Sequence, residues 1–443
     1  MIYRKWYSEN RSNIIGRFVE MKRIGMPIDI NYEIDENMEL TNYAGLGIII
    51  KLMEMLNIFR ELSVKFGMKV RNKVYSEFNY IYLLLINFLT GGGVIRDIER
   101  FKNDKVFQKL FNFSKDIPNS SAIYKFLYKA NKEAVERFYK INNNILKKIL
   151  KLVYKDRKKA LRVYCFMDSS ELEVYGKDFE GASKNYNGDM ALRIHAIFLE
   201  DFLVSLRLYS PKGHNVTYGW EELLNDLKSI QDIIGSSEIY IMMDSAYYDY
   251  DLIDRIEKEG WKYSITAKNY PILFDEADII SESDWEDNYS SFEYFPEKRD
   301  KSYRIVVKRE EKEENDLFFK YDYHFIITNN REETPQKIFS LHSTKMGMEN
   351  HFKDLLIYLN LHHPRQKSLF ANRFYYQIGM LAYNLIKAIQ YLKITGHDFF
   401  LSIKSFILRY IFIPGKLVTY SNKLTLKIPY FPGGKKHLYH LLS

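Results

Sequence analysis

The sequence predicts an α/β fold in which a mixed β-sheet is flanked by helices, follows an all-α region and is interrupted by a β-rich insertion. Three observations support this prediction. Apolar residues recur at helical spacing through the first third of the 443-residue chain. From about residue 161, short apolar runs of strand length begin, and they then alternate with amphipathic helices. Acid-rich, strand-forming residues 270–335 separate this part from the last helices.

Residues 1–155 form the predicted helical region. One strongly apolar helix is brought to an end by three glycines, and a glycine also closes the helix before it. Ser120 or Ser121 is expected to be the N-cap of a long helix, because a serine side chain there accepts a hydrogen bond from a free backbone N–H. The helices are predicted over 45–67, 75–93, 104–113 and 120–153.

A DNA-binding surface is predicted near the start of the last of these helices. Two short helices joined by a turn would form a helix-turn-helix, whose second helix enters the major groove. That helix would present Ser121, Tyr124, Lys125 and Lys129 to DNA. A helical bundle with a solvated basic face explains the same residues equally well, so both interpretations stay open.

Residues 156–269 and 336–395 are predicted to be two parts of one core, on either side of the insertion 270–335. The first part begins with three strands in series, of which the second and third are connected as in a hairpin. The strands are expected over 161–167, 191–199, 202–208, 238–243 and 261–268, with helices over 219–234 and 249–259. Helices follow over 335–358 and 366–394, and the C-terminal region 396–443 contains a predicted β-hairpin.

Charge is distributed unevenly along the chain, although the net charge is only +8. Residues 1–160 carry 30 Lys and Arg against 17 Asp and Glu. Residues 161–340 carry 21 against 37, and residues 341–443 carry 14 against 3. Two basic flanks around an acidic middle indicate that the flanks bind a polyanion and that the middle binds cations. Uneven surface charge without a function is the alternative.

The single cysteine, Cys165, lies in a predicted strand and is expected to be a buried core thiol. A lone cysteine forms no internal disulfide, which fits a reducing compartment, and it excludes a cysteine-based zinc site. The chain shows no secretory signal pattern, and its most apolar segment, 81–89, is too short to span a bilayer. We therefore expect a cytoplasmic protein with no membrane partner.

Two aspartates each follow the apolar part of a predicted strand. Asp168 comes after "LRVYCFM", and Asp244 comes after "EIYIMM". In sheets whose strands alternate with helices, ligands bind at the carboxyl ends of the strands. If these two strands are parallel neighbours, the carboxylates stand close together, and both stay ionised only when a positive charge lies between them. Mg²⁺ or Mn²⁺ with oxygen ligands is the expected partner.

Glu349 is the candidate for a third carboxylate, because residues 341–443 contain few acids. His342, Lys345, Glu349 and Lys353 are spaced so that they lie on one face of an α-helix. One acid among three basic groups is the pattern expected when the acid binds a metal ion and the basic groups bind phosphates. An ordinary solvated helix with an i,i+4 ion pair is the alternative.

Together these features resemble the DDE transposases of prokaryotic insertion sequences, which have an RNase H-like core. More narrowly, they resemble the subgroup with a β-rich insertion before the glutamate and a Tyr-Arg-Glu-Lys signature on the glutamate helix. The matching strings are MDSSELEVYGKDFEGASKNYN, MDSAYYDYDLIDRIEKEGWKYSITAK and MENHFKDL, followed by NRFYYQIGMLAYNLIKA. Further matches before and after the core extend the resemblance over most of the chain.

The resemblance implies an RNase H-like mixed sheet and DNA cleavage and strand transfer with two Mg²⁺ ions, for which Mn²⁺ can substitute. Asp168 would bridge both ions, while Asp244 and Glu349 would each complete one coordination sphere. The basic groups His342, Lys345 and Lys353 would neutralise phosphates. The implied partners are double-stranded DNA, as terminal inverted repeats and as target, and a second copy of the chain in a homodimer on the DNA.

The signature residues of the subgroup are partly replaced in this chain. His342 and Lys345 stand at the tyrosine and arginine positions, and Leu356 stands at the lysine position, with Lys353 one turn earlier. Lysine binds a phosphate as a point charge, without the two-pronged geometry of arginine. Two other functions therefore stay open: a catalytically impaired, transposase-derived DNA-binding protein, and an RNase H-like nuclease without strand transfer.

Overall fold

A computed structural model describes residues 39–429 of the chain, except 69–74, 112, 114–116, 156–161, 177, 186, 213–216, 236–237, 298, 312–320, 395 and 421–422. All the elements below belong to one unit, Leu40–Ser443. The region limits at 155, 269, 335 and 395 stay predictions. In the described part of the chain, no helix has both the length and the apolar character needed to cross a bilayer.

The predicted helical region is helical, but its helices are shorter than expected. Asn57 adopts a left-handed conformation with φ 56° and so ends the first predicted helix early. The long helix over 120–153 is two helices, and their N-caps are Asn119 and Asn131 rather than Ser120 or Ser121. The elements are α3 (Leu46–Met55), α4 (Ile58–Leu62), α5 (Glu77–Leu89), η1 (Ile95–Phe101), α6 (Lys105–Leu110), α7 (Ser120–Leu127) and α8 (Lys132–Val153).

The central sheet is mixed, as predicted. Its order in space is β3-β4-β2-β6-β7-β10-β9-β8, with β5 paired to β4. The strands are β2 (Arg162–Glu173), β3 (Ser183–Lys184), β4 (Met190–Leu199), β5 (Phe202–Tyr209), β6 (Glu238–Met243), β7 (Lys262–Thr266), β8 (Tyr289–Tyr294), β9 (Tyr303–Glu311) and β10 (Tyr321–Thr328).

The core of this sheet has the topology of an RNase H-like fold. Strand β5 is antiparallel to β4, and β4 is antiparallel to β2, whereas β2, β6 and β7 are parallel. Helices α9 (Trp220–Ile234) and α10 (Tyr250–Lys258) provide the crossover connections of the parallel strands. Across the sheet these five core strands follow one another as β5-β4-β2-β6-β7. Numbered by their order along the chain, they are the third, second, first, fourth and fifth strands of the core.

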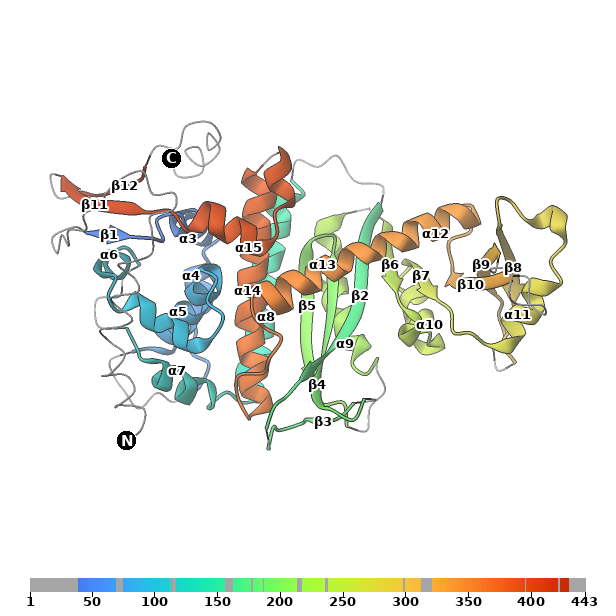
Figure 1. The fold of residues 1–443 in the computed structure, drawn as a ribbon, viewed down its shortest axis with the longest axis horizontal. Helices are drawn as coiled ribbons and strands as arrows, with labels where there is room; N and C mark the ends of the chain where they lie inside the picture. The colour runs from blue at the N-terminus through green and yellow to red at the C-terminus, as the bar shows by residue number, and fades with distance from the viewer. Residues whose placement is uncertain are drawn as a thin grey trace, which may run out of the picture. The chain divides into compact units, whose positions relative to one another are not determined.

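The insertion is β-rich, as predicted, but its strands continue the core sheet instead of forming a separate one. Strand β10 pairs with β7, so that Ile326 lies opposite Thr266, and β9 and β8 follow beyond it. Helix α11 (Pro271–Asp278) and the short η3 (Glu282–Asp284) complete the insertion, which lies at the right of Figure 1.

One long helix, α14 (Leu369–Lys393), connects the two halves of the unit. It lies beside α8, between the N-terminal helices and the sheet (Figure 1). Nearly every residue from Ala371 to Gln390 is buried, which is typical of a helix surrounded by protein on all sides. Its polar residues reach backbone groups of β5: Asn384 bonds both the N–H and the C=O of Leu203.

The segment 335–358, predicted as one helix, changes helix type along its length. It consists of α12 (Pro335–Ser343), the 3₁₀ turn η4 (Thr344–Gly347), α13 (Met348–Phe352) and the π-helical turn η5 (Lys353–Tyr358). The side-chain spacing of a regular α-helix therefore does not apply beyond Ser343.

The C-terminal hairpin is confirmed as β11 (Gly415–Tyr420) and β12 (Lys423–Lys427). Residues 421–422, between these two strands, lie outside the described residues. Strand β11 also pairs with β1 (Leu40–Thr41), so the start of the unit and the C-terminal hairpin form one three-stranded sheet. The elements between α14 and β11 are η6 (Gly396–Phe400), α15 (Ile403–Phe406) and η7 (Ile407–Ile411).

Candidate functional site

Strand pairing places Asp168 and Asp244 at the same level of the sheet. Strands β2 and β6 are parallel, and their register pairs Arg162 with Glu238 and Phe166 with Met242. Continued by two residues, this register brings Asp168 level with Asp244, which follows the end of β6. The predicted neighbouring, parallel arrangement of the two strands is therefore confirmed.

Asp168 does not end its strand, which corrects the prediction. Strand β2 runs on to Glu173, because from Asp168 onward it keeps its antiparallel partner β4 after its pairing with β6 has stopped. The Asp168 carboxylate thus lies where β2 no longer pairs with β6 but still pairs with β4. Its orientation is set by the backbone N–H of Ser169, which donates to Oδ1 at 2.8 Å.

The electrostatic environment of Asp168 disfavours an isolated carboxylate. Burial raises the pKa of Asp168, and the nearby Asp244 raises it further, whereas Lys345 lowers it. The ammonium group of Lys345 lies 3.7 Å from Oδ2 of Asp168. The negative charge of two carboxylates at this level of the sheet is thus offset by the positive charge of Lys345. Binding of an additional cation would be favoured there.

Asp244 caps the short turn that follows β6. Its Oδ1 accepts a hydrogen bond at 3.0 Å from the N–H of Ala246, in η2 (Ser245–Tyr247). Tyr247 is fully buried beside both aspartates, and burial together with their charges raises its pKa well above the ordinary value. Tyr247 therefore stays a neutral phenol that closes one side of the aspartate pair.

Glu349 lines the same cavity as Asp168. This cavity has a volume of about 470 Å³, and His342 and Lys345 also line it. We call it the aspartate cavity. In the described part of the chain, no three His, Cys, Asp or Glu side chains lie close enough together to form a metal site. Glu349 therefore faces the cavity without completing a preformed three-carboxylate cluster.

Hard oxygen donors of this kind fit a magnesium ion. Mg²⁺ is commonly held by one or two carboxylates, with water and substrate phosphates as its other ligands. Asp168 and Asp244 provide two carboxylates at one level, and burial and the charge of Asp244 raise the pKa of Asp168 even though Lys345 lies beside it. The donor set is therefore suited to a divalent cation whose remaining ligands come from elsewhere.

His342 is held by hydroxyl groups of the sheet. Its Nδ1 lies 2.8 Å from Oγ of Ser264, and its Nε2 lies 3.0 Å from Oγ1 of Thr266, both in β7. Burial and the charge of Lys345 lower its pKa to about 4. A neutral imidazole offers one donor and one acceptor, which these two hydroxyls satisfy. At neutral pH, His342 is therefore an uncharged group, not the cation that phosphate binding was predicted to use.

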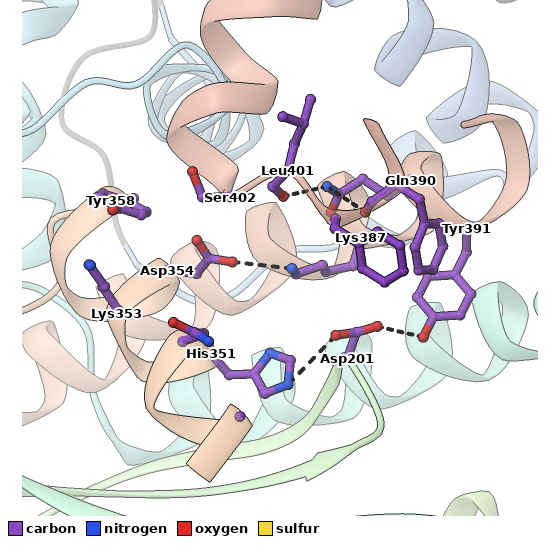
Figure 2. Close-up of a pocket in the computed structure, with 14 residues that line it drawn as sticks. Asp201, His351, Lys353, Asp354, Tyr358, Lys387, Gln390, Tyr391, Leu401 and Ser402 are labelled. Atoms are coloured by element: carbon purple, nitrogen blue, oxygen red, sulfur yellow. Dashed lines mark hydrogen bonds and ion pairs between the residues drawn. The ribbon is translucent and has the colours of Figure 1, made fainter. Parts of the chain in front are cut away.

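Lys353 lies apart from His342, Lys345 and Glu349, contrary to the one-face prediction. It lines a second cavity of about 480 Å³, which His342, Lys345 and Glu349 do not line. The change from α-helix to π-helix at Lys353 alters the side-chain spacing that the prediction assumed. Figure 2 shows Lys353 beside Tyr358 at this second cavity.

The second cavity contains functional candidates that the sequence did not single out. Two acidic side chains, Asp201 and Asp354, lie there with His351 and Lys387 as their partners (Figure 2). We call these four residues, together with Tyr383, the anchor network. The only signal in the sequence was the scarcity of acids in its last part, which draws attention to Asp354 as well as Glu349.

The predicted DNA-contacting residues lie on or just after α7. Ser121, Tyr124 and Lys125 are exposed, and Lys129 is half-buried in the turn after the helix. Residues 111–119 separate α6 from α7, which is longer than the turn of about three or four residues in a helix-turn-helix. An exposed basic surface is thus present without the short turn of that motif.

Cys165 is a core residue, as predicted, and His195 is a second buried residue of the sheet. The Cys165 thiol is free and fully buried in β2, and burial raises its pKa, so that it is not a nucleophile. His195 is fully buried in β4, and its ring contacts the rings of Tyr209 and Tyr247.

Comparisons with known proteins found a matching family model and a similar solved structure. The family model described as "Transposase DDE domain group 1" matches residues 35–443. Among solved structures, a cryo-EM structure of the piggyBac transposase synaptic complex with hairpin DNA is similar, with a TM-score of 0.45 and 12% sequence identity over 84% of each chain. No curated protein matches the chain. Because the family model covers nearly the whole sequence, this chain belongs to the family of transposases with a DDE domain of group 1.

Proposed function

We propose that this protein is an active transposase, which cleaves DNA at the ends of an insertion sequence and joins those ends to target DNA. The observation that carries the proposal is the common level of Asp168 and Asp244 on neighbouring parallel strands, with Glu349 on the cavity that Asp168 lines. Membership of the DDE transposase family supports the same function.

Asp168, Asp244 and Glu349 are the residues that would hold two Mg²⁺ ions, for which Mn²⁺ can substitute. When bound, such ions activate a water or a DNA 3′-hydroxyl for attack and stabilise the leaving 3′-oxygen. The Ser169 N–H holds the Asp168 carboxylate in one orientation, and buried Tyr247 excludes water from one side of the pair. Lys345 is close enough to Asp168 to neutralise a phosphate that enters the aspartate cavity.

DNA recognition is proposed for the helical region. The exposed side chains of α7 are Ser121, Tyr124 and Lys125, and Lys129 follows them. Lysines at this surface would pair with backbone phosphates of a terminal inverted repeat, and the polar side chains would lie toward the bases. Because strand transfer joins two element ends, we propose that two copies of the chain act together on DNA.

The proposed function is tested with a labelled element end, taken from inverted repeats that flank the coding region. Strand cleavage is measured with Mg²⁺, Mn²⁺ and Ca²⁺ in parallel. Wild-type protein should nick the end with Mg²⁺ or Mn²⁺, and Asp168→Asn should abolish nicking while leaving end binding intact. Substantial Mg²⁺-dependent nicking by Asp168→Asn would refute the assignment of this carboxylate.

A second variant tests DNA-end binding separately from DNA cleavage. Lys125→Ala combined with Lys129→Ala should weaken end binding, and it should lower the salt dependence of binding by about one counter-ion per lysine. Lys258→Ala, which changes an exposed lysine at the end of α10 in the acidic middle of the chain, serves as the control. End binding that is equal in all these proteins would remove α7 from the proposed DNA interface.

A second candidate function is a DNA-binding protein without cleavage activity. Two observations favour it: His342 is neutral and bonded to the sheet, and the described residues hold no preformed three-ligand group. End binding without any nicking by the wild-type protein, under all three metal ions, would support this candidate over the first.

A further inference from the structure

The segment that carries Glu349 has little structure of its own to hold it in place. Residues Thr344–Tyr358 form a 3₁₀ turn, a five-residue α-helix and a π-helical turn. Isolated helices of this length are not stable, because their few hydrogen bonds do not offset the entropy of ordering the backbone. The position of Glu349 therefore depends on tertiary contacts of neighbouring residues.

The first such contact is a buried ion pair between the segment and α14. Nζ of Lys387 lies 3.1 Å from Oδ2 of Asp354, and these residues are only 8% and 5% exposed. The other carboxylate oxygen of Asp354 accepts a hydrogen bond at 3.0 Å from the N–H of Ile403. One side chain thus ties η5 to α14 and to the start of α15 (Figure 2).

The second contact is made by His351, two residues after Glu349. Its Nδ1 lies 3.1 Å from the hydroxyl of Tyr383, and its Nε2 lies 3.6 Å from Oδ1 of Asp201. The other oxygen of Asp201 accepts a hydrogen bond from Tyr391 at 2.6 Å (Figure 2). The imidazole also stacks on the ring of Phe198, with centroids 5.2 Å apart. His351 is therefore held by polar contacts and by ring packing.

These contacts lie on the side of the segment away from the candidate catalytic side chain. Glu349 lines the aspartate cavity, whereas His351 and Asp354 line the second cavity. Buried ion pairs are a poor source of stability, because desolvation of both charges offsets their attraction, and apolar replacements are often neutral or stabilising. A buried pair at this place is better explained by the geometry that it imposes.

We propose that the anchor network (Asp201, His351, Asp354, Tyr383 and Lys387) positions Glu349 for metal binding at the aspartate cavity. This inference rests on the proposed function of Glu349 as a metal ligand. In this proposal the anchor residues contact neither DNA nor a metal ion. They are positioning residues, which act by holding a segment without stable structure of its own against α14 and the turn between β4 and β5.

The test uses a variant that removes the ion pair without leaving a buried charge. In the double variant Asp354→Asn with Lys387→Met, the asparagine still accepts the Ile403 N–H, and both side chains keep nearly their original size. His351→Phe is the second variant, because it keeps a ring against Phe198 and removes both polar contacts. The control is Arg207→Met with Asp226→Leu, which removes a similar ion pair (2.6 Å) between β5 and α9.

Three measurements are made on the full-length proteins. Hydrogen exchange over residues 344–353 should be at least tenfold faster in the anchor variants and unchanged in the control. Calorimetry with Mn²⁺ alone should show about tenfold weaker binding, again only in the anchor variants. The Mg²⁺ concentration for half-maximal cleavage should rise by a similar factor, with DNA-end binding unchanged.

The outcomes separate positioning from mere stabilisation. Folded anchor variants with wild-type exchange over 344–353, or with faster exchange but unchanged Mn²⁺ affinity, would overturn the proposal. If the wild-type protein binds no Mn²⁺ and cleaves no DNA, the proposed function fails by itself. Exchange over 344–353 then still decides whether the network holds this segment, since it requires neither metal nor DNA.

Discussion

At the scale of single residues, His342 is a half-buried base whose charge state affects folding. Its pKa is lowered to about 4, mainly by burial, whereas an unfolded chain binds the proton near pH 6.5. Below pH 6.5 the unfolded state therefore binds a proton that the folded state does not, so the group destabilises the fold as the pH falls toward 4. Above pH 6.5 it contributes no such penalty.

His342→Gln should remove this pH dependence, because an amide can still donate to and accept from the hydroxyls of Ser264 and Thr266. We expect the wild-type protein to lose up to about 3 kcal/mol of unfolding free energy through His342 between pH 6.5 and pH 4. The variant should lose correspondingly less, as measured by urea unfolding at both pH values. Parallel pH profiles in the two proteins would contradict the lowered pKa.

Lys345 is the second residue whose role depends on charge. It lies 3.7 Å from Asp168 and lines the aspartate cavity, so Lys345→Met should remove the positive charge nearest to an entering phosphate. We expect cleavage of an element end to slow by about 10²–10³, as for the loss of one preorganised donor at a reacting oxygen. Gel-based cleavage assays at saturating Mg²⁺ measure this rate.

Lys345→Arg is the matched control, because it keeps the charge and adds a two-pronged donor. It should retain cleavage, and it restores the residue type of the subgroup signature at this position. Equal rates for Lys345→Met and the wild-type protein would show that this lysine only offsets the charge of Asp168.

At the scale of elements, the contact of α14 with strand β5 depends on one buried amide. Asn384 donates to the carbonyl of Leu203 at 2.8 Å and accepts from its N–H at 2.9 Å, so it pairs two backbone groups that β4 leaves free. Asn384→Leu keeps the volume but leaves both groups buried without a partner. We expect a loss of about 2–4 kcal/mol in unfolding free energy.

Chemical denaturation of both proteins measures that loss, with Asn143→Ala, at a half-buried position of α8, as the control. Asn143 makes a single exposed hydrogen bond to Ser229, so its removal should change the unfolding free energy by no more than about 0.5 kcal/mol. If Asn384→Leu changed the unfolding free energy as little as Asn143→Ala, the backbone N–H and C=O of Leu203 would be hydrogen-bonded to water in the variant.

At the scale of the whole molecule, one apolar core joins the helical region to the sheet. The main cluster of buried residues runs from Tyr43 in the N-terminal part to Ile413 near the C-terminal hairpin, and it includes α14 throughout. The three-stranded sheet of β1, β11 and β12 also joins the start of the unit to the C-terminal hairpin. We therefore expect Leu40–Ser443 to unfold as one cooperative unit.

Two probes test this expectation in one urea titration. Trp220, Trp261 and Trp285 report on the sheet and the insertion, whereas far-UV circular dichroism is dominated by helices throughout the unit. The two unfolding curves should have the same midpoint. Separate midpoints would mean that the helical region is stable without the sheet.

Local sequence patterns were enough to predict many elements. The apolar run Glu238–Met243 is a strand with the predicted bounds, because strand length and apolar character are properties of the run itself. Helix α5 was predicted for the same reason, with its glycines after it. The break at Asn57 was missed, since a left-handed asparagine has no strong signal in a helical pattern.

Sequence patterns predicted only part of the candidate site. Asp168 and Asp244 were recognised because each follows an apolar run, and their strands are parallel neighbours as expected. The continuation of β2 to Glu173 was missed, because it depends on the partner strand β4. Lys353 was placed on the wrong face, because side-chain spacing cannot show where an α-helix becomes a π-helix.

By itself, the sequence determined the α/β class, the basic and acidic regions and the two aspartates, since each depends on the composition or periodicity of a short stretch. Only the tertiary structure decided that β10 joins β7, that α14 connects helices and sheet, and that Asp354 pairs with Lys387. These contacts join residues far apart in the chain. Their partners are chosen by packing and by the burial of charge, which no local pattern records.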